Sequence, residues 1–422
     1  MPGPTMSVPQ RRARHGAALT LVFAGVLAAG AATGSWSEDG RDGRTPTEYR
    51  APSRTAARAV DRHAADRHGV DRRAVEAAAS AAARDGRSGS EAAAEVVSRS
   101  GDDWSAVYSA REYEGFALAL DGAYVGVGLT TRRDADGRME AGSVVPGGPA
   151  DRAGIEPGDR IVSVDGTEVT GRPVTEVVAL LRGDARSYPA AWDEAGAAGT
   201  PVRVVLRRAG RQWERTLHRE RLVTESVETV RLEDGGGAGD GVAPPATLVR
   251  VDSFTRGTGQ RVREAVDAAA PGEGIVLDLR GNPGGLVSEA VTTASAFLDG
   301  GLVATYDVHG KERALRAARG GDTRRPLVVL VDGGTMSAAE LLAGALQDRG
   351  RAVVVGSGTF GKGSVQMPSR LADGSVAELT VGHYRTPDGR AVDGSGITPD
   401  LAAGGDAEQR ARTVLGGLGG GS

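Results

Sequence analysis

The chain has 422 residues and a mass of 43.1 kDa, enough for two or three domains that each bury a core. Its formal net charge of −4, without any basic stripe, leaves no electrostatic surface for nucleic acid. The absence of cysteine excludes disulfides, thiolate zinc sites and cysteine nucleophiles. No spacing of histidine and acidic residues suggests a metal site, and we expect no cofactor.

The N-terminal segment is predicted to direct export. Three arginines precede an uncharged run within residues 1–34, and Ala29-Gly30-Ala31 is a candidate cleavage site. The segment is a signal peptide or a signal anchor, and we favour cleavage because its alanines and glycines make it only moderately hydrophobic. Either outcome places the body of the protein outside the cytoplasm, secreted or attached to the outer face of the cytoplasmic membrane.

A polar linker and a helical region are expected next. Residues 35–60 are charged and polar, which is typical of a linker. Alanine-rich stretches within residues 61–118 predict helices that break at Gly86 and Gly89. We interpret this N-terminal helical region as a packing or dimerisation element, and it is our candidate contact for a homo-oligomer.

Short β runs separated by turn signals occupy residues 120–222. A segment at 184–198 is inserted before the last of them, and the glycine-rich residues 223–245 are predicted to be a linker. In this block we expect one helix at 173–181 and strands at 124–130, 142–145, 160–164 and 202–207.

Strands and helices alternate from residue 246, which predicts a mostly parallel sheet covered on its faces. The strand at 376–381 alternates more strongly and is expected at an edge of the sheet. We assign residues 246–402 to this α/β core and residues 403–422 to a flexible tail. The expected helices are 259–269, 287–298 and 337–349, and the expected strands are 248–251, 275–279, 327–331 and 352–355.

Glycine-rich loops follow three of these strands, at residues 280–285, 332–337 and 356–363. The carboxyl ends of parallel strands meet at one rim of a sheet, so Ser337, Lys362 and the first loop are expected there together. Ser337 opens a helix, where a serine is most often an N-cap. It can also be a nucleophile, if a base lies beside it.

Lysine is scarce, since Lys311 and Lys362 are the two lysines among 51 basic residues. An arginine cannot lose its proton in a protein, whereas a desolvated lysine can. Lys362 is therefore the candidate base, and Lys311 is interpreted as a solvated charge. A Ser-His-Asp triad is less well placed, because no histidine beyond the targeting region lies in a glycine-rich loop at a strand end, and His383 falls within a predicted strand.

Two further elements complete the predicted site. The main-chain amides of Gly284 and Ala338 are the candidates for an oxyanion hole, since Pro283 has no N–H to donate. Gln366 lies four residues beyond Lys362, where it either orients the amine or is an ordinary polar strand residue.

These loops resemble those of the C-terminal processing peptidases, also called tail-specific proteases. The resemblance covers roughly residues 70–402 and implies a crotonase-like α/β peptidase core. It makes Ser337 the nucleophile, Lys362 the general base and Gln366 the partner that orients the lysine. The segments that carry the resemblance are Asp278–Gly285, Gly334–Glu340, Thr359–Gln366 and Gly396–Asp400.

The segment from Tyr124 to about Arg219 resembles the PDZ domain of the same peptidases, on Gly148-Pro149-Ala150 and Val164-Asp165-Gly166 among other matches. The resemblance implies that successive amides bind the terminal carboxylate of a substrate, and that the next strand pairs with the peptide. The residues of this expected loop are Tyr124, Val125, Gly126, Val127, Gly128 and Leu129.

The sequence therefore predicts an exported serine endopeptidase that selects proteins by their C-terminal residues and cleaves them through an acyl-enzyme. One alternative is a PDZ adaptor or scaffold with a non-catalytic peptidase fold, and a weaker one is a hydrolase of small amides. The complete set of Ser337, Lys362 and Gln366 argues against the scaffold. The PDZ region argues against a small substrate.

Overall fold

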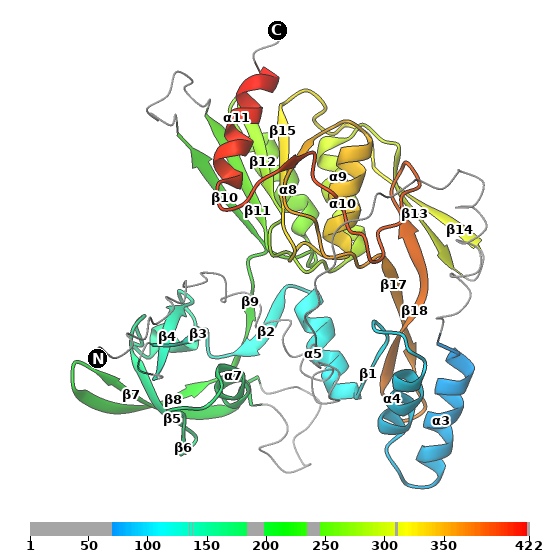
Figure 1. The fold of residues 1–422 in the computed structure, drawn as a ribbon. Coiled ribbons are helices and arrows are strands. Elements are labelled where there is room, and N and C mark those ends of the chain that lie inside the picture. The colour runs from blue at the N-terminus through cyan, green and yellow to red at the C-terminus, as the bar shows by residue number, and fades with distance from the viewer. Residues whose placement is uncertain are drawn as a thin grey trace, which may run out of the picture. The chain divides into compact units, whose positions relative to one another are not determined.

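The computed structural model describes residues 70–134, 136, 138–183, 198–233, 245–308 and 311–419 (Figure 1). The predicted export segment, the linker at 35–60 and nearly all of the insertion at 184–198 lie outside these residues. The chain divides into two compact units. Val125–Leu222 form the β-rich unit, and Val223–Ser422 with the described part of Arg44–Tyr124 form the core unit. No helix within the described residues is long and apolar enough to cross a membrane.

The centre of the core unit is a six-stranded sheet in the order β10-β11-β12-β15-β16-β19. All neighbours from β11 to β19 are parallel, as the sequence predicts, and β10 is antiparallel to β11. The predicted linker at 223–245 is therefore partly wrong, because β10 lies within it. The strands are β10 (Val227–Leu232), β11 (Ala246–Val251), β12 (Gly274–Asp278), β15 (Leu327–Val331), β16 (Val353–Gly356) and β19 (Leu401–Ala402).

Helices cover both faces of this sheet, which explains why every residue of β12 and β15 is buried. On one face lie α8 (Thr258–Ala268), α9 (Val287–Phe297) and α10 (Ala338–Asp348). On the other lies α11 (Ala407–Gly419), whose residues Ala407, Ala411 and Leu415 are buried (Figure 1). The prediction of a flexible tail at 403–422 is thus wrong, because this segment buries an apolar stripe on the sheet.

A second sheet of the core unit has the order β1-β18-β13-β14, with β17 paired to β18. The strand predicted at an edge is β18, and it pairs with three strands. That prediction is wrong, because the alternation along β18 reflects a sheet covered on one face rather than an edge position. The strands are β1 (Ala106–Tyr108), β13 (Leu302–Val308), β14 (Lys311–Arg316), β17 (Ser364–Arg370) and β18 (Val376–Arg385).

The N-terminal part of the core unit contains α3 (Arg72–Arg84), α4 (Gly89–Arg99) and α5 (Ala110–Leu120). α3 and α4 lie beside the far end of the β17–β18 hairpin (Figure 1), and apolar residues of the two helices pack against residues of the hairpin. The side chains of Asp71 and Ser88 cap α3 and α4. These helices are therefore fixed to the hairpin whose first strand follows Lys362.

The β-rich unit contains a sheet in the order β3-β4-β5-β7-β8, with β6 paired to β5. The single strand expected at 124–130 is broken at Val127 and Gly128, because Gly128 has a φ of 76°. Before the break, β2 (Ala123–Gly126) pairs with β9 (Glu220–Val223). The other elements are β3 (Leu129–Arg133), β4 (Met139–Val144), α6 (Pro149–Arg152), β5 (Arg160–Val164), β6 (Thr167–Glu168), α7 (Val174–Arg182), β7 (Pro201–Arg208) and β8 (Arg211–His218).

Candidate active site

Three loops meet at the carboxyl ends of the parallel strands, as the topology predicts. The amide of Met336 donates to the carbonyl of Asn282 at 2.9 Å, and the amide of Phe360 donates to the carbonyl of Thr335 at 3.0 Å. The first bond joins loop 332–337 to loop 280–285, and the second joins loop 356–363 to loop 332–337. The rim of the sheet therefore holds all three glycine-rich loops as one hydrogen-bonded group.

The side chains of Asp332 and Thr335 make additional hydrogen bonds between loop 332–337 and the end of β12 with the loop that follows it. Asp332 Oδ1 accepts from the amide of Gly281 at 2.8 Å and from the amide of Gly334 at 2.9 Å. The buried Thr335 hydroxyl donates to the carbonyl of Leu279 at 2.9 Å. The end of β12 and the loop that carries Ser337 are thus held in one register.

Ser337 precedes α10 with a φ of 55° and a ψ of −116°, a conformation that non-glycine residues rarely adopt. Strain of this kind persists only where the surroundings determine the backbone, and it concentrates at functional sites. The amide of Ser337 donates to Glu340 Oε2 at 2.8 Å. The residue as a whole is half-buried.

Glu340 joins the serine loop to the lysine loop. Its side chain is fully buried, and its Oε2 accepts from the amides of both Ser337 (2.8 Å) and Lys362 (2.9 Å). Its Oε1 accepts from the Thr359 hydroxyl at 2.6 Å and from the amide of Gly361 at 2.7 Å. One carboxylate group therefore binds the backbones of both predicted dyad residues.

Tyr384, from β18, also contacts both loops. Its hydroxyl lies 2.7 Å from the carbonyl oxygen of Ser337 and 2.9 Å from that of Lys362, as a donor to either. Burial raises the pKa of Tyr384 well above its ordinary value, so the hydroxyl keeps its proton for this bond. The sequence analysis missed Tyr384, because nothing local marks a tyrosine within a strand. It also missed Glu340, although a glutamate three residues after a serine at a helix start is a capping pattern.

Lys362 is half-buried at the rim. Burial lowers the pKa of its amine below the ordinary value, because the charged form loses its hydration. Carboxylates act in the opposite direction, with Asp102 first among them. Within the described residues no hydrogen bond joins the amine to the Ser337 hydroxyl, so the loops are brought together but the two side chains are not bonded.

Gln366 lies in β17, on the strand that follows Lys362. Its side-chain amide donates to Ser364 Oγ at 2.9 Å and to Thr380 Oγ1 at 3.3 Å. In the described part of the chain it makes no hydrogen bond to Lys362. The side-chain nitrogen is thus engaged with hydroxyls, and the side-chain oxygen is the atom left for an amine.

Gly284 lies against the start of α10. A β-carbon on Gly284 would stand 3.1 Å from Ser337 Cβ and 3.2 Å from the amide nitrogen of Ala338, so glycine is required by this close approach. The amide of Gly284 itself donates to Asn282 Oδ1 at 2.8 Å. Of the two amides predicted to form an oxyanion hole, the one from Gly284 is therefore already bonded within its own loop. The amide of Ala338 donates to no group among the described residues.

The loop predicted to bind a carboxylate is divided between two elements. Tyr124, Val125 and Gly126 lie in β2, which pairs with β9, so their amides do not form one loop with the rest. The amides of Val127 and Gly128 donate to none of the described residues. Leu129 begins β3, an edge strand of its sheet.

Two models of known protein families match parts of the chain. A family model described as peptidase family S41 matches residues 246–403, and a PDZ domain model matches residues 140–187. The core of this chain belongs to peptidase family S41. Among all the residues that the structure describes, no group of three or more acidic or histidine side chains is placed to hold a metal ion.

The chain is also similar in sequence to proteins named as processing proteases. The carboxy-terminal processing protease CtpA of Bacillus subtilis (strain 168) is 32% identical over 307 residues, which are 72% of this chain and 61% of that protein. The chloroplastic carboxyl-terminal-processing peptidase 3 of Arabidopsis thaliana is 33% identical over 316 residues, 72% of this chain and 58% of that protein. The chain thus spans less than two thirds of the length of these relatives.

A solved structure of a photosystem II D1 C-terminal processing protease is 29% identical to this chain. The alignment covers 86% of this chain and 96% of that one, with a TM-score of 0.47.

Proposed function

We propose that the protein is an exported serine endopeptidase in which Ser337 is the nucleophile and Lys362 the general base. The observation that carries the proposal is that one oxygen of the Glu340 carboxylate, Oε2, accepts hydrogen bonds from the main-chain amides of both residues. Two residues 25 positions apart are thereby held within the span of a single side chain. The crotonase-like description of the core stays a prediction.

The proposed reaction follows from these positions. Neutral Lys362 takes the proton of the Ser337 hydroxyl as Oγ attacks the carbonyl carbon of the scissile peptide bond. The tetrahedral intermediate collapses when the C–N bond breaks and the Lys362 ammonium returns its proton to the leaving amine. Water then attacks the ester carbonyl as Lys362 takes its proton. The ester C–O bond breaks, the Lys362 ammonium returns this proton to Ser337 Oγ, and the new C-terminal carboxyl group leaves. The lowered pKa of Lys362 supports this role, because more of the amine is neutral near neutral pH.

The start of α10 supports stabilisation of the oxyanion. The amide of Ala338 stands in the first turn of the helix, where the positive end of the dipole lies. Gly284 joins it as the second donor once its amide leaves the side chain of Asn282. Gln366 orients the amine of Lys362 through its free side-chain oxygen.

We infer that the β-rich unit selects substrates by their C-termini. The unengaged amides of Val127 and Gly128 suit a terminal carboxylate, and the free edge of β3 suits a peptide strand that adds to the sheet. Export, membrane attachment by the N-terminal segment and a homo-oligomer through the helical region rest on the sequence pattern alone. The named relatives support a processing protease acting on protein substrates.

The test compares the wild-type protein with Ser337→Ala on an unfolded protein that ends in apolar residues, with fragments identified by mass spectrometry. Cleavage by the wild type and none by Ser337→Ala are expected. Equal cleavage by both variants would contradict the assignment of the nucleophile. Binding of the same protein without cleavage by either variant would instead support the alternative of a PDZ scaffold.

A further inference from the structure

An aromatic side chain from the N-terminal helical region lies against the predicted base. The Nζ atom of Lys362 is 4.8 Å from the ring centroid of Trp104, a distance at which an indole contacts an amine directly. The rings of Trp104 and Phe360 pack edge to face, with the centroids 5.8 Å apart and the planes at 71°. The ring of Trp104 thus forms a wall beside the amine, and Phe360, two residues before the lysine, packs against that ring.

The position of Trp104 is fixed by its own short loop between α4 and β1. The amide of Trp104 donates to Asp102 Oδ1 at 2.9 Å, and the hydroxyl of Ser105 donates to Asp102 Oδ2 at 2.6 Å. Ser105 Oγ in turn accepts from the amide of Thr380 in β18 at 2.9 Å. The loop is therefore bonded to the strand that pairs with β17, the strand that follows Lys362.

We propose that Trp104 is a positioning residue for Lys362, whose indole excludes water from one side of the amine and fixes the place of Nζ at the rim. The proposal rests on the proposed role of Lys362 as general base. It gives the N-terminal helical region a part in the active site, where the sequence suggested only a packing or dimerisation element.

Trp104 acts on the amine in two opposite ways. Its apolar surface removes water and favours neutral Lys362, whereas the face of its ring attracts the charged form. Burial lowers the pKa of Lys362, and the indole of Trp104, 4.8 Å from Nζ, supplies part of the apolar surface beside the amine. In the proposed role, the exclusion of water is the stronger of the two influences. The charged groups that act on the amine from the surrounding elements are all acidic and raise its pKa: Asp102 from the loop of Trp104, Glu378 from β18, Asp393 from the loop after β18, and Glu340 from α10.

Two substitutions separate these influences. Trp104→Ala opens the wall, so water reaches Lys362 and the acidic limb of the kcat/KM pH profile moves to higher pH. The rate then falls several-fold near neutral pH and recovers in alkaline solution. Trp104→Leu keeps an apolar wall but removes the ring, so the limb stays in place or moves to lower pH. A purely structural role for Trp104 would lower the rate equally at every pH.

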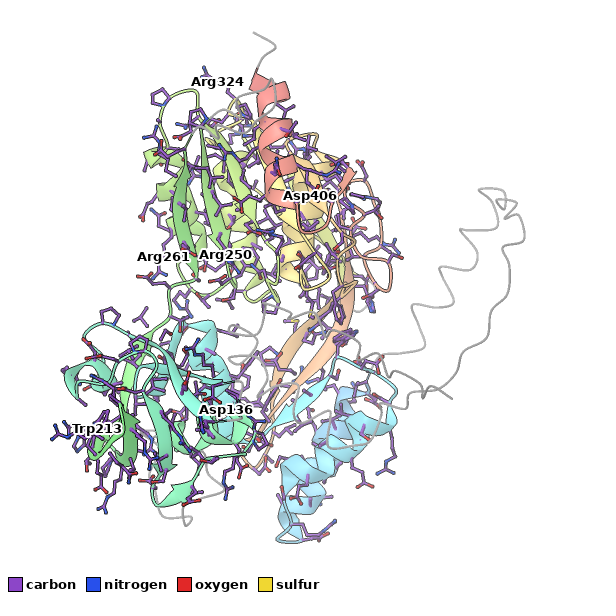
Figure 2. The ribbon with its side chains drawn as sticks, turned by 60° about the vertical axis from the view of Figure 1, so that its left-hand side comes forward. Asp136, Trp213, Arg250, Arg261, Arg324 and Asp406 are labelled. Carbon is purple, nitrogen blue, oxygen red and sulfur yellow. The ribbon has the colours of Figure 1, made fainter. Side chains whose placement is uncertain are left out.

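A matched control exists in the β-rich unit. Trp213, labelled in Figure 2, also carries a cation over its ring, with the guanidinium carbon of Arg208 at 5.4 Å from the centroid. Trp213→Ala makes the same substitution at a tryptophan of the same kind in a different unit. We expect it to leave the pH profile of cleavage unchanged, and a shift equal to that of Trp104→Ala would overturn the proposal.

The amine can also be followed without any cleavage. The chain has two lysines, so competitive labelling with acetic anhydride over a range of pH, resolved by peptide mass spectrometry, titrates Lys362 with the exposed Lys311 as internal reference. In a Ser337→Ala background, Trp104→Ala is expected to move the labelling of Lys362 to higher pH and to leave Lys311 unchanged. Unchanged labelling of Lys362 in a folded Trp104→Ala protein would overturn the inference.

Failure of the inference is distinguishable from failure of the proposed function. If Lys362→Ala retains the wild-type rate of cleavage, the assignment of the base is wrong, and the inference about Trp104 as its positioning residue is overturned with it. If Lys362→Ala is inactive while Trp104→Ala keeps the wild-type pH profile, the base is right and only the role of Trp104 is wrong.

Discussion

Replacement of Glu340 by glutamine tests how the two loops of the active site are held together. The four donors around this carboxylate lie at 2.6–2.9 Å, and all belong to buried or half-buried residues. In Glu340→Gln the new amide nitrogen takes the place of one oxygen. With the nitrogen in the place of Oε2, the amides of Ser337 and Lys362 both lose their acceptor. With the nitrogen in the place of Oε1, the amide of Gly361 loses its acceptor, whereas the Thr359 hydroxyl can turn and accept from the new N–H group.

The magnitude follows from the cost of a buried donor without an acceptor, which is about 1–3 kcal/mol each. At least one such donor remains in either orientation, so the expected loss in the free energy of unfolding is about 1–3 kcal/mol, measured by urea denaturation. The loop of Lys362 loses a hydrogen bond in either orientation, from Gly361 or from Lys362 itself, so peptide cleavage is expected to fall roughly 100-fold, as for a misplacement of about 1 Å.

Glu273→Gln is the matched control. Glu273 is also buried, and it accepts from the amide of Ala270 at 3.0 Å and from Arg231 at 3.2 Å, just before β12 begins and so at the opposite end of the sheet. It is expected to lower stability and leave the rate of cleavage by folded protein unchanged. A Glu340→Gln protein with wild-type stability and activity would refute the reasoning.

Three further outcomes are expected. Gly284→Ala is expected to lower the rate of cleavage roughly 100-fold, because the new β-carbon meets the loop that carries Ser337. Gly281→Ala is the control: Gly281 also has a positive φ, but the space around it is open, so this variant is expected to keep its activity. Arg219→Met removes four hydrogen bonds that the buried guanidinium donates to three carbonyls and one hydroxyl. It is expected to lower the melting temperature of the β-rich unit in calorimetry, with a loss of about 2–4 kcal/mol, and an unchanged transition would contradict this. The hydrogen bond to Asp393 raises the pKa of His383 in the folded protein. The pair therefore stabilises the fold fully below about pH 6.5, the ordinary pKa of histidine, and less as the pH rises through the raised pKa of the folded state. His383→Asn should lower the melting temperature more in acidic than in alkaline buffer, and an equal loss in both would argue against this.

The parallel sheet was predictable because its strands are continuous apolar runs. The strand expected at 327–331 coincides with β15, and each of its five residues is buried. The glycine-rich loops follow such strands in the sequence, so their meeting at one rim required only the topology of parallel strands. The positions of Ser337 and Lys362 at that rim could therefore be predicted without a structure.

The surroundings of Lys362 could not be predicted in the same way. Trp104 and Tyr384 lie 258 positions before and 22 positions after the lysine, and no local period or turn marks either residue. Their places depend on strand pairing across the second sheet, where β1 and β17 both pair with β18. The helix α11 was missed for a related reason: its stripe of Ala407, Ala411 and Leu415 is short, and burial on the sheet stabilises it in spite of three glycines.

Lys362 is proposed to act by accepting the proton of Ser337, and the variant Lys362→Arg is the decisive test of this role. Arginine keeps the positive charge and the length of the side chain but cannot become neutral. The measurement is the rate of cleavage of an unfolded protein by wild type and by Lys362→Arg, with circular dichroism to show that both are folded. We expect no cleavage by Lys362→Arg at any pH. Full activity of that variant would contradict this role.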